Sequence, residues 1–570
     1  MTKKIRYLMC VLLVLALSGC ASIPTSGPVE SQPRRTADQA QGGVTIVANH
    51  PPKGASASMI IRGFLTAMAS FNETTAREYL TDQAAATWQP DSQVLIYASA
   101  SSPRVNGNQV TISAPLIGYL DADGSFSGAE ESVWNHDFGM VVQDGELRIS
   151  NPPPGVALSQ YMFSQSYMRI DTYFFPTAGT TLVPDPRYVP RWDWDRTTAA
   201  RLVVNGPSQW LQGIVDNPPQ RTVSWGGDQV SLSSQGTADV PLSCPGGLGR
   251  DDATHMAIEI AATVRDMVGV NRIRVTCDGT PVPLTGSAPD SSLPVSVADG
   301  YASVQTGSTE DLAIVQDNVV ATMTSRQSLP VDGDWGTTAR TIQSLAASQT
   351  GQLAAVSADS LLVGPVGSDP PTAALSAPGL LRPQFDAQGN IWAVSSALSV
   401  TAVSVVTPAG VVPVDSSAVA SMDIRGFQVS PDGHRILLWR QVDLGDGPRT
   451  ELGIALITYD GDTPSAIISW KPIRLIWEGA PLRSVIDVAW LGPSSVLVLS
   501  ATGVYFADID GLEMDSWGLP QAWTPVEMSI HATASSPQIA VLDQSGTVWS
   551  YQNGYWFSAG ENISSIAYAP

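Results

Sequence analysis

The sequence predicts a multidomain fold, with α+β regions in its first half and an all-β propeller of about six blades in its second half. The chain has 570 residues, enough for three or four domains at roughly 150 residues each. Before residue 300, apolar residues at helical spacing alternate with short strand-like runs, whereas after residue 300 short apolar runs recur about 40 residues apart. A β repeat of that length, bounded by turn residues, is typical of a propeller.

The overall composition favours a folded acidic protein and excludes a nucleic-acid binder. There are 30 Lys and Arg residues against 52 Asp and Glu, which gives a formal net charge of −22, and hydrophobic residues make up 43% of the chain. That hydrophobic content argues against global disorder. Because phosphate binding needs clustered Lys and Arg and the sequence has no basic block, we expect no nucleic-acid partner.

The first twenty residues predict a bacterial lipoprotein signal peptide. Three basic residues precede ten apolar residues, 8–17, which are too few for the roughly 20 that span a bilayer but suit a signal-peptide core. Residues 17–20, Leu-Ser-Gly-Cys, then match a lipobox, in which small residues enter the peptidase cleft and the thiol is acylated. We expect cleavage between Gly19 and Cys20, loss of residues 1–19, and an N-palmitoyl, S-diacylglycerol modification of Cys20. A plain secretory signal with a chance cysteine is the alternative.

A lipidated cysteine predicts a protein held at the extracytoplasmic face of the cell membrane. One acyl chain binds weakly and firm anchoring needs more than one, which a processed lipoprotein supplies. Residues 20–50 are rich in Ser, Thr, Pro, Gln and Gly, and are expected to form a lipid-anchored flexible linker. No other run of 18 apolar residues occurs, so no further membrane span is predicted.

Residues 51–155 are predicted to form a small α+β domain of the NTF2-like kind. Helical spacing predicts a helix over 58–71, and a second over 74–80 has Asn72 as its candidate N-cap. Strands are expected at 94–97, 109–112 and 133–142, and hairpin turns at the Asn-Gly and Asp-Gly pairs 106–107, 123–124 and 144–145. Two helices before a meander favour this fold, and a Pro-rich breaker at 152–155 marks its end.

Residues 160–285 are predicted to form a second α+β domain. Its expected elements are a strand at 169–175, helices at 198–204 and 253–268, and a strand at 273–276. Cys244 and Cys277 lie here, 33 residues apart, and remain once Cys10 leaves with the signal and Cys20 is lipidated. Two cysteines left over in an exported domain are a disulfide candidate. Two free thiols are the alternative, and no C-x-x-C pair indicates a metal.

Residues 300–570 are predicted to form the propeller domain. Six turn-plus-strand units are spaced by roughly 40 residues, except for about 60 between the fourth and fifth, where we expect an insertion around 443–464. The units lie at 311–315, 351–356, 389–394, 430–439, 494–499 and 536–541. Six blades follow from this count, with five or seven blades and an irregular β-sandwich as alternatives.

The chain carries no motif that predicts catalysis, a metal or a cofactor. G-x-S-x-G, a Gly-Lys dipeptide and H-E-x-x-H are absent, and the five histidines are scattered without ligand spacing. Two Asp-rich turns, 121–124 and 508–511, resemble Ca²⁺ loops, but their glycines come too early for an EF-hand, so hairpin turns explain them better. Aromatic clusters favour domain core over sugar stacking; they are Trp192 with Trp194, and Tyr551 with Tyr555 and Trp556.

The region 160–285 resembles a GerMN domain. The similarity rests on Tyr-Phe at 173–174, the Leu-Val-Pro-Asp-Pro-Arg-Tyr-Val run at 182–189, Asn-Gly-Pro at 205–207, and residues 263–270 leading to Asp-Gly at 278–279. Preceded by a lipobox and an NTF2-like region and followed by a propeller, it resembles the LpqB lipoproteins of actinobacteria over nearly the whole chain. The 183–189 run is the most specific piece, and we expect it to be a strand and turn in which Arg187 pairs with a carboxylate.

The resemblance implies an accessory protein rather than an enzyme. The LpqB family is linked to the MtrAB two-component system, which implies contact with the extracytoplasmic domain of an MtrB-like sensor histidine kinase. Altered phosphorylation of the regulator MtrA, and effects on cell-wall homeostasis and division, would follow. The resemblance carries over no binding residues. Two other readings stay open: a cell-envelope module that binds peptidoglycan or another cell-wall polymer, and an exported hydrolase.

Overall fold

The computed structural model describes residues 48–569, with gaps at 101, 108, 130–131, 216–222, 304–310, 325–326, 368, 444, 446, 519–522 and 532–536. The predicted signal peptide, the cleavage site between Gly19 and Cys20, the lipidation of Cys20 and the linker as far as residue 47 lie outside the described residues. Residues 43–570 form one structural unit, and three regions of it are described in turn.

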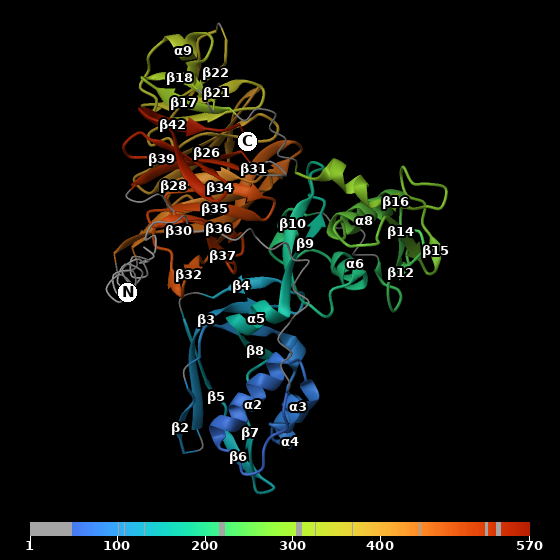
Figure 1. Cartoon of the computed structure of the whole chain (residues 1–570). Helices are drawn as coiled ribbons and strands as arrows, with labels where there is room; N and C mark the ends of the chain where they lie inside the picture. Colours follow the sequence, from blue (N-terminus) through green and yellow to red (C-terminus); the bar gives the residue numbers. More distant parts are fainter. Residues whose placement is uncertain are drawn as a thin grey trace, which may run out of the picture. The chain divides into compact units, whose positions relative to one another are not determined.

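The N-terminal region combines three short helices with a sheet built around one long strand (Figure 1). The helices are α2 (Ala57–Ala69), α3 (Glu73–Glu78) and α4 (Asp82–Thr87). The hydroxyl of Ser56 caps α2 by accepting a hydrogen bond from the Met59 amide, and the helix buries Ile60 and Phe64. The side chain of Asn72 caps α3, accepting from the Thr75 amide at 3.0 Å, so both predicted helices and the predicted cap are confirmed.

The sheet of this region has the order β2-β3-β1-β8, and β4 and β5 also pair with β3. The strands are β1 (Val94–Tyr97), β2 (Arg104–Asn106), β3 (Gln109–Leu120), β4 (Phe126–Gly128), β5 (Val133–Asp137), β6 (Met140–Gln143), β7 (Glu146–Ile149) and β8 (Val156–Ser159). The predicted hairpin turns lie between β2 and β3, β3 and β4, and β6 and β7. The single strand expected over 133–142 is wrong: Gly139 adopts φ +56°, which ends β5 and starts the separate β6–β7 hairpin.

The middle region consists of a two-stranded ribbon and a mixed sheet with helices. Its strands are β9 (Tyr167–Phe174), β10 (Val183–Pro190), β11 (Ser224–Trp225), β12 (Ser231–Leu232), β13 (Thr237–Ser243), β14 (Arg272–Cys277), β15 (Thr280–Pro281) and β16 (Leu293–Pro294). Its helices are α5 (Gln160–Ser166), α6 (Arg196–Asn205) and α8 (Arg250–Thr263). Helix α8 ends at Thr263, five residues before the predicted end at 268. Val268, which the prediction placed on the apolar face of this helix, is instead 99% exposed.

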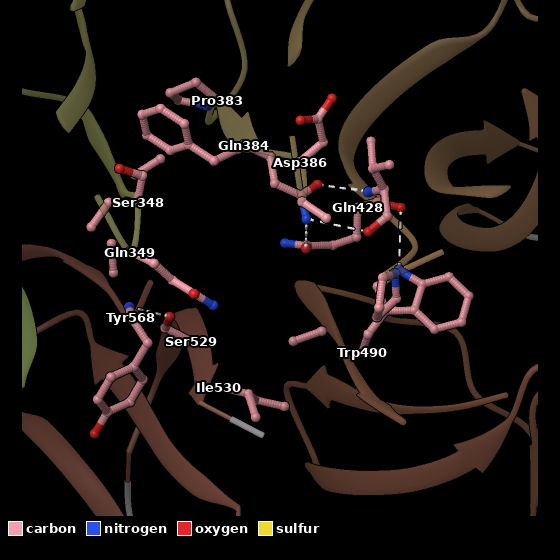
Figure 2. Close-up of a pocket in the computed structure, with 18 of the residues that line it drawn as sticks. Ser348, Gln349, Pro383, Gln384, Asp386, Gln428, Trp490, Ser529, Ile530 and Tyr568 are labelled. Atoms are coloured by element: carbon pink, nitrogen blue, oxygen red, sulfur yellow. Dashed lines mark hydrogen bonds between the residues drawn. The ribbon is translucent and has the colours of Figure 1, made fainter. Parts of the chain in front are cut away.

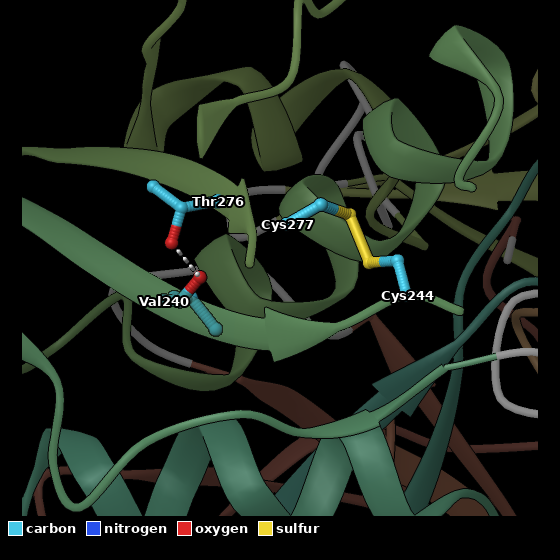
Figure 3. Close-up of a disulfide and its surroundings, with 4 residues drawn as sticks. All are labelled: Val240, Cys244, Thr276 and Cys277. Carbon is cyan, nitrogen blue, oxygen red and sulfur yellow. Dashed lines mark hydrogen bonds between the residues drawn. A yellow bond between two sulfur atoms is a disulfide. The ribbon is translucent and has the colours of Figure 1, made fainter. Parts of the chain in front are cut away.

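Cys244 and Cys277 are joined by a disulfide at the end of two parallel strands (Figure 3). Cys277 is the last residue of β14, and Cys244 follows the last residue of β13. The two Cα atoms lie 5.5 Å apart, within the usual range for a bridge. The bridge therefore ties the two strands at the end of their pairing, where Leu242 lies opposite Cys277.

Removing the bridge is expected to lower the free energy of unfolding by about 3 to 4 kcal/mol, because the closed loop restricts the unfolded chain. The double variant Cys244→Ala, Cys277→Ala avoids a lone thiol, and guanidinium unfolding followed by circular dichroism measures the change. The same titration on wild-type protein with and without reductant is the control. Equal stability of the variant and the oxidised protein would contradict the expectation.

The C-terminal region contains six four-stranded antiparallel sheets in the described residues, the number that the sequence repeat predicts. The first three are β42-β17-β18-β19, β20-β21-β22-β23 and β24-β25-β26-β27, and the last three are β28-β29-β30-β31, β34-β35-β36-β37 and β38-β39-β40-β41. Each of the six sequence units contains the second strand of one sheet: β17 (Leu312–Gln316), β21 (Gln352–Ser357), β25 (Ile391–Ala397), β29 (Arg435–Asp443), β35 (Ser495–Ser500) and β39 (Gln538–Asp543).

The six sheets form a closed, propeller-like ring. The inner strands are β20 (Ser344–Ala347), β24 (Gln384–Phe385), β28 (Asp423–Val429), β34 (Asp487–Gly492), β38 (Pro525–His531) and β42 (Ile563–Ala567). Strand β42, the last of the chain, pairs with β17 and so completes the first sheet. Because β42 also contacts β20 and β38, the ring is closed by the two ends of the region.

The outer strands complete the six sheets. They are β18 (Val319–Met323), β19 (Ser328–Pro330), β22 (Ser360–Pro365), β23 (Thr372–Ser376), β26 (Val400–Thr407), β27 (Gly410–Val414), β30 (Pro448–Asp460), β31 (Thr463–Pro472), β36 (Gly503–Asp508), β37 (Met514–Ser516), β40 (Val548–Gln552) and β41 (Tyr555–Gly560). The insertion expected around 443–464 is wrong, since most of it is strand β30. The extra residues instead lengthen the fourth sheet and form a small hairpin, β32 (Ile476–Trp477) with β33 (Ala480–Pro481).

Candidate functional site

A cavity of about 380 Å³ lies where the inner strands of the ring meet (Figure 2). Its volume falls within the roughly 300–1,000 Å³ usual for small-molecule sites. All six sheets contribute to its lining, which includes Ser348, Gln349, Arg382, Gln384, Phe385, Asp386, Gln428, Trp490, Ser529, Ile530 and Tyr568. We call it the central cavity.

Four glutamines line the central cavity, namely Gln349, Gln384, Gln388 and Gln428. The Oε1 atom of Gln384 accepts a hydrogen bond from the Val429 amide at 2.6 Å, and its Nε2 atom donates to Oε1 of Gln428 at 2.8 Å. Gln384 is therefore held by its neighbours and in turn orients Gln428. Figure 2 shows the amide groups of Gln428 and Gln349 directed into the cavity from two different sheets.

Aromatic rings and hydroxyl groups complete the wall. The Nε1 atom of Trp490 donates to the Gln428 carbonyl at 3.4 Å, and the Arg435 guanidinium lies 5.1 Å from the centre of the Trp490 ring. The hydroxyl of Ser529 accepts a hydrogen bond from the Tyr568 amide at 2.8 Å. Each of these two hydrogen bonds joins sheets that are neighbours in the ring. The residues of the wall are therefore held in place by the adjacent sheet.

Arg382 lines the cavity and reaches across to three other sheets. It precedes β24, pairs with Asp487 at 3.0 Å, and donates to the backbone carbonyls of Met528 at 2.9 Å and Ile566 at 3.1 Å. A second carboxylate, Glu527, lies 3.4 Å from its Nε atom. One arginine therefore links the third, fifth, sixth and first sheets.

Two carboxyl groups, those of Asp487 and Glu527, lie beside the positive charge of Arg382. Burial raises the pKa of Glu527 to about 7, although the positive charge of Arg382 opposes the shift. Burial likewise raises the pKa of Asp487. Glu527 also accepts a hydrogen bond from the Ser565 hydroxyl at 3.1 Å. Glu527 thus adjoins Arg382 with a raised pKa, beside the cavity rather than in its lining.

The two Asp-rich turns are hairpin turns, as predicted, and both meet arginines of the β9–β10 ribbon. In the β3–β4 turn, Asp123 pairs with Arg187 at 2.8 Å. In the β36–β37 turn, Asp508 and Asp510 lie 3.6 and 3.4 Å from Arg169. Arg187 also pairs with Asp185 at 2.6 Å, which confirms the carboxylate partner expected for it. Among the described residues, no group of three or more His, Cys, Asp or Glu side chains is arranged to hold a metal.

The aromatic clusters named from sequence lie away from the central cavity. Tyr551 stacks on Trp517 at 5.2 Å between ring centres and also contacts Trp556, so this cluster belongs to the packing between strands, as predicted. Trp192 is 59% exposed and lies against Phe71 at 4.0 Å, so the core position expected for it is wrong, whereas Trp194 packs against the core of the middle region. Tyr555 is likewise 37% exposed. Sequence reasoning missed the cavity glutamines, because Gln384 and Gln428 are single polar residues of inner strands and Gln349 lies between β20 and β21, so no pattern marks them.

Two family models match the chain. The one described as the N-terminal domain of lipoprotein LpqB matches residues 50–164, and the one described as the lipoprotein LpqB beta-propeller domain matches residues 317–565. A protein named lipoprotein LpqB from Cutibacterium acnes is 28% identical, with 97% of each chain covered. The chain belongs to the LpqB lipoprotein family.

Further LpqB proteins show the same extent of similarity. That of Mycobacterium bovis is 28% identical over 90% of each chain, and that of Streptomyces coelicolor is 25% identical over 90% of this chain and 89% of its own. Among solved structures, a chain of the nidogen/laminin complex has a TM-score of 0.33 at 12% identity, covering 45% of this chain and 97% of its own. In the described part of this LpqB chain, no helix is long and apolar enough to cross a membrane.

Proposed function

We propose that this LpqB chain is a lipid-anchored extracytoplasmic protein that modulates an MtrB-like sensor histidine kinase, in a two-component system acting on cell-wall homeostasis and division. The observation that carries the proposal is the pair of LpqB family matches at both ends of the chain, behind a lipobox that ends at Cys20. We assign an NTF2-like domain to 51–155, a GerMN domain to 160–285 and a propeller to 300–570.

The contacts of the β9–β10 ribbon support a role in which the three domains act together. Arg187 reaches the turn that holds Asp123 in the first domain, and Arg169 reaches Asp508 and Asp510 in the third. A partner that docks on one domain can therefore influence the others. Modulation requires that the chain bind the two signalling states of the kinase with different affinity, and a shared membrane raises the effective concentration of both partners.

Crosslinking in intact cells tests the proposal. A tagged chain is crosslinked and purified, and the proteins recovered with it are identified for wild type, Cys20→Ala and the matched control Ser18→Ala, which keeps the acylated cysteine. Recovery of a membrane histidine kinase with wild type and Ser18→Ala, but not with Cys20→Ala, supports both the partner and the anchor. Recovery of cell-wall fragments or wall enzymes without any kinase would overturn the direct contact.

A further inference from the structure

We propose that the central cavity binds an uncharged polyhydroxylated ligand, a neutral sugar. The cavity is lined by Gln349, Gln428, Trp490, Tyr568 and Arg382 among others, and the amides of Gln349 and Gln428 are directed into it (Figure 2). It goes beyond the kinase role, since it concerns a small ligand and holds whether or not a kinase is bound.

The charged side chains around the cavity already have partners within the protein. Of the side chains that line it, only Arg382 and Asp386 are basic or acidic. Arg382 is paired with Asp487 and lies beside Glu527, and the Asp386 carboxyl group accepts hydrogen bonds from the Asn390 amide and the Trp392 indole. Since moving an unpaired charge out of water is costly, a phosphate or a carboxylate, which finds Arg382 already paired, gains no counter-charge here.

The amides that remain suit hydroxyl groups. A carboxamide offers both donors and an acceptor, which is the pairing that a sugar hydroxyl needs. Gln384 fixes the orientation of Gln428 through the 2.8 Å hydrogen bond to its Oε1 atom, so the Nε2 atom of Gln428 is turned toward the cavity (Figure 2). A donor held in place before binding loses little entropy when the ligand arrives. Gln349 presents its amide from another sheet, so a ring between them can be held from two sides.

Arg382 lines the cavity but is already engaged. Its guanidinium reaches Asp487 and the carbonyls of Met528 and Ile566 on three other sheets. Trp490 and Phe385 also belong to the lining, but they are only 4% and 3% exposed. A ligand is therefore expected to be held mainly through the polar groups of the cavity.

Calorimetric titration of the full mature chain in detergent tests the proposal directly. The probes are methyl β-glucoside, methyl β-galactoside, methyl β-N-acetylglucosaminide and the corresponding β-1,4-linked disaccharides. Glucose 6-phosphate serves as the charged comparison, and N-acetyl-trialanine amide serves as an uncharged peptide. We expect at least one neutral sugar to bind, the disaccharide more tightly than the monosaccharide, and the phosphorylated sugar to bind more weakly than its neutral counterpart.

Three variants locate the binding. Gln428→Leu and Gln349→Leu remove one amide each, and each is expected to weaken sugar binding about tenfold. Because Gln349 is exposed, Gln349→Leu is expected to fold even if Gln428→Leu does not. Gln552→Leu, an exposed glutamine on β40, is the matched control and should bind as wild type. Absence of binding by every neutral sugar at millimolar concentration, tighter binding of the phosphate or the peptide, or binding that neither cavity variant weakens would overturn the proposal. None of these results depends on recovering a kinase.

Discussion

The variant Arg187→Met is expected to lose about 3 to 5 kcal/mol of unfolding free energy, because it removes the cation from a buried ion pair and leaves the carboxylate behind. Arg187 is 1% exposed and Asp185 is 3% exposed. The Asp185 oxygen that pairs with Arg187 at 2.6 Å also accepts the Ser208 amide at 2.7 Å. Arg187 further donates to the Gly206 carbonyl at 3.2 Å, so one side chain holds β10 and the end of α6. Denaturant unfolding followed by circular dichroism measures the loss.

Arg425→Met is the matched control for this prediction. Arg425 pairs with Asp423 at 2.7 Å, but its side chain is 51% exposed, and exposed pairs contribute about 0 to 1 kcal/mol. The two variants remove the same side chain and the same kind of partner, so they differ mainly in burial. Equal losses in the two variants, or a loss below about 1 kcal/mol at Arg187, would show that burial of the pair does not stabilise the fold.

Arg187 shows which of its contacts the local sequence predicts and which it does not. The run at 183–189 is expected from its sequence to be a strand and turn; the strand is confirmed but the turn is wrong, since all of it belongs to β10. Each proline fixes φ, and a buried arginine needs a carboxylate. The sequence could not identify Asp123 as one of the two partners, since the two residues are 64 positions apart and belong to different sheets. The Asp-rich turns were recognisable as turns from their glycines, but their role as arginine partners depends on tertiary structure alone.

The strands of the ring also differ in how clearly the sequence marks them. The second strand of each sheet is packed between neighbouring sheets, so it appears in the sequence as an apolar run such as Leu497, Val498 and Leu499, all fully buried. The inner strands face the channel and interrupt that pattern with polar groups, for example Gln428 on β28 and Asp487 on β34. Blade number could therefore be predicted from the apolar repeat, whereas the cavity could not, because its polar residues resemble those of any loop.

The second large effect is expected at Arg382. Arg382→Met should lower the unfolding free energy by about 3 to 5 kcal/mol at pH 8, because Asp487 and Glu527 would then lose the positive charge that stabilises their ionised forms against burial. Arg382 also donates to carbonyls of two further sheets, so the variant weakens contacts across the ring as well as an ion pair. Unfolding at several pH values, followed by tryptophan fluorescence, measures the loss.

The direction of the pH dependence follows from Glu527. Its folded pKa of about 7 lies above the value of about 4.3 of an unfolded chain. The unfolded chain therefore releases this proton first, and stability contributed by the protonated carboxyl is lost as pH rises from about 4.3 to about 7. The cost of Arg382→Met should be smaller at pH 5, where Glu527 is protonated, than at pH 8.

Glu527→Gln separates this cause from simple loss of packing. The amide keeps the shape of the side chain but cannot ionise, so this variant should be more stable than wild type at pH 8, and the difference between the two should be smaller at pH 5. In the double variant with Arg382→Met, it should restore part of the stability lost at pH 8. A loss in Arg382→Met that is the same at both pH values, or that Glu527→Gln does not reduce, would mean that Arg382 acts through its backbone contacts rather than by neutralising the two carboxyl groups.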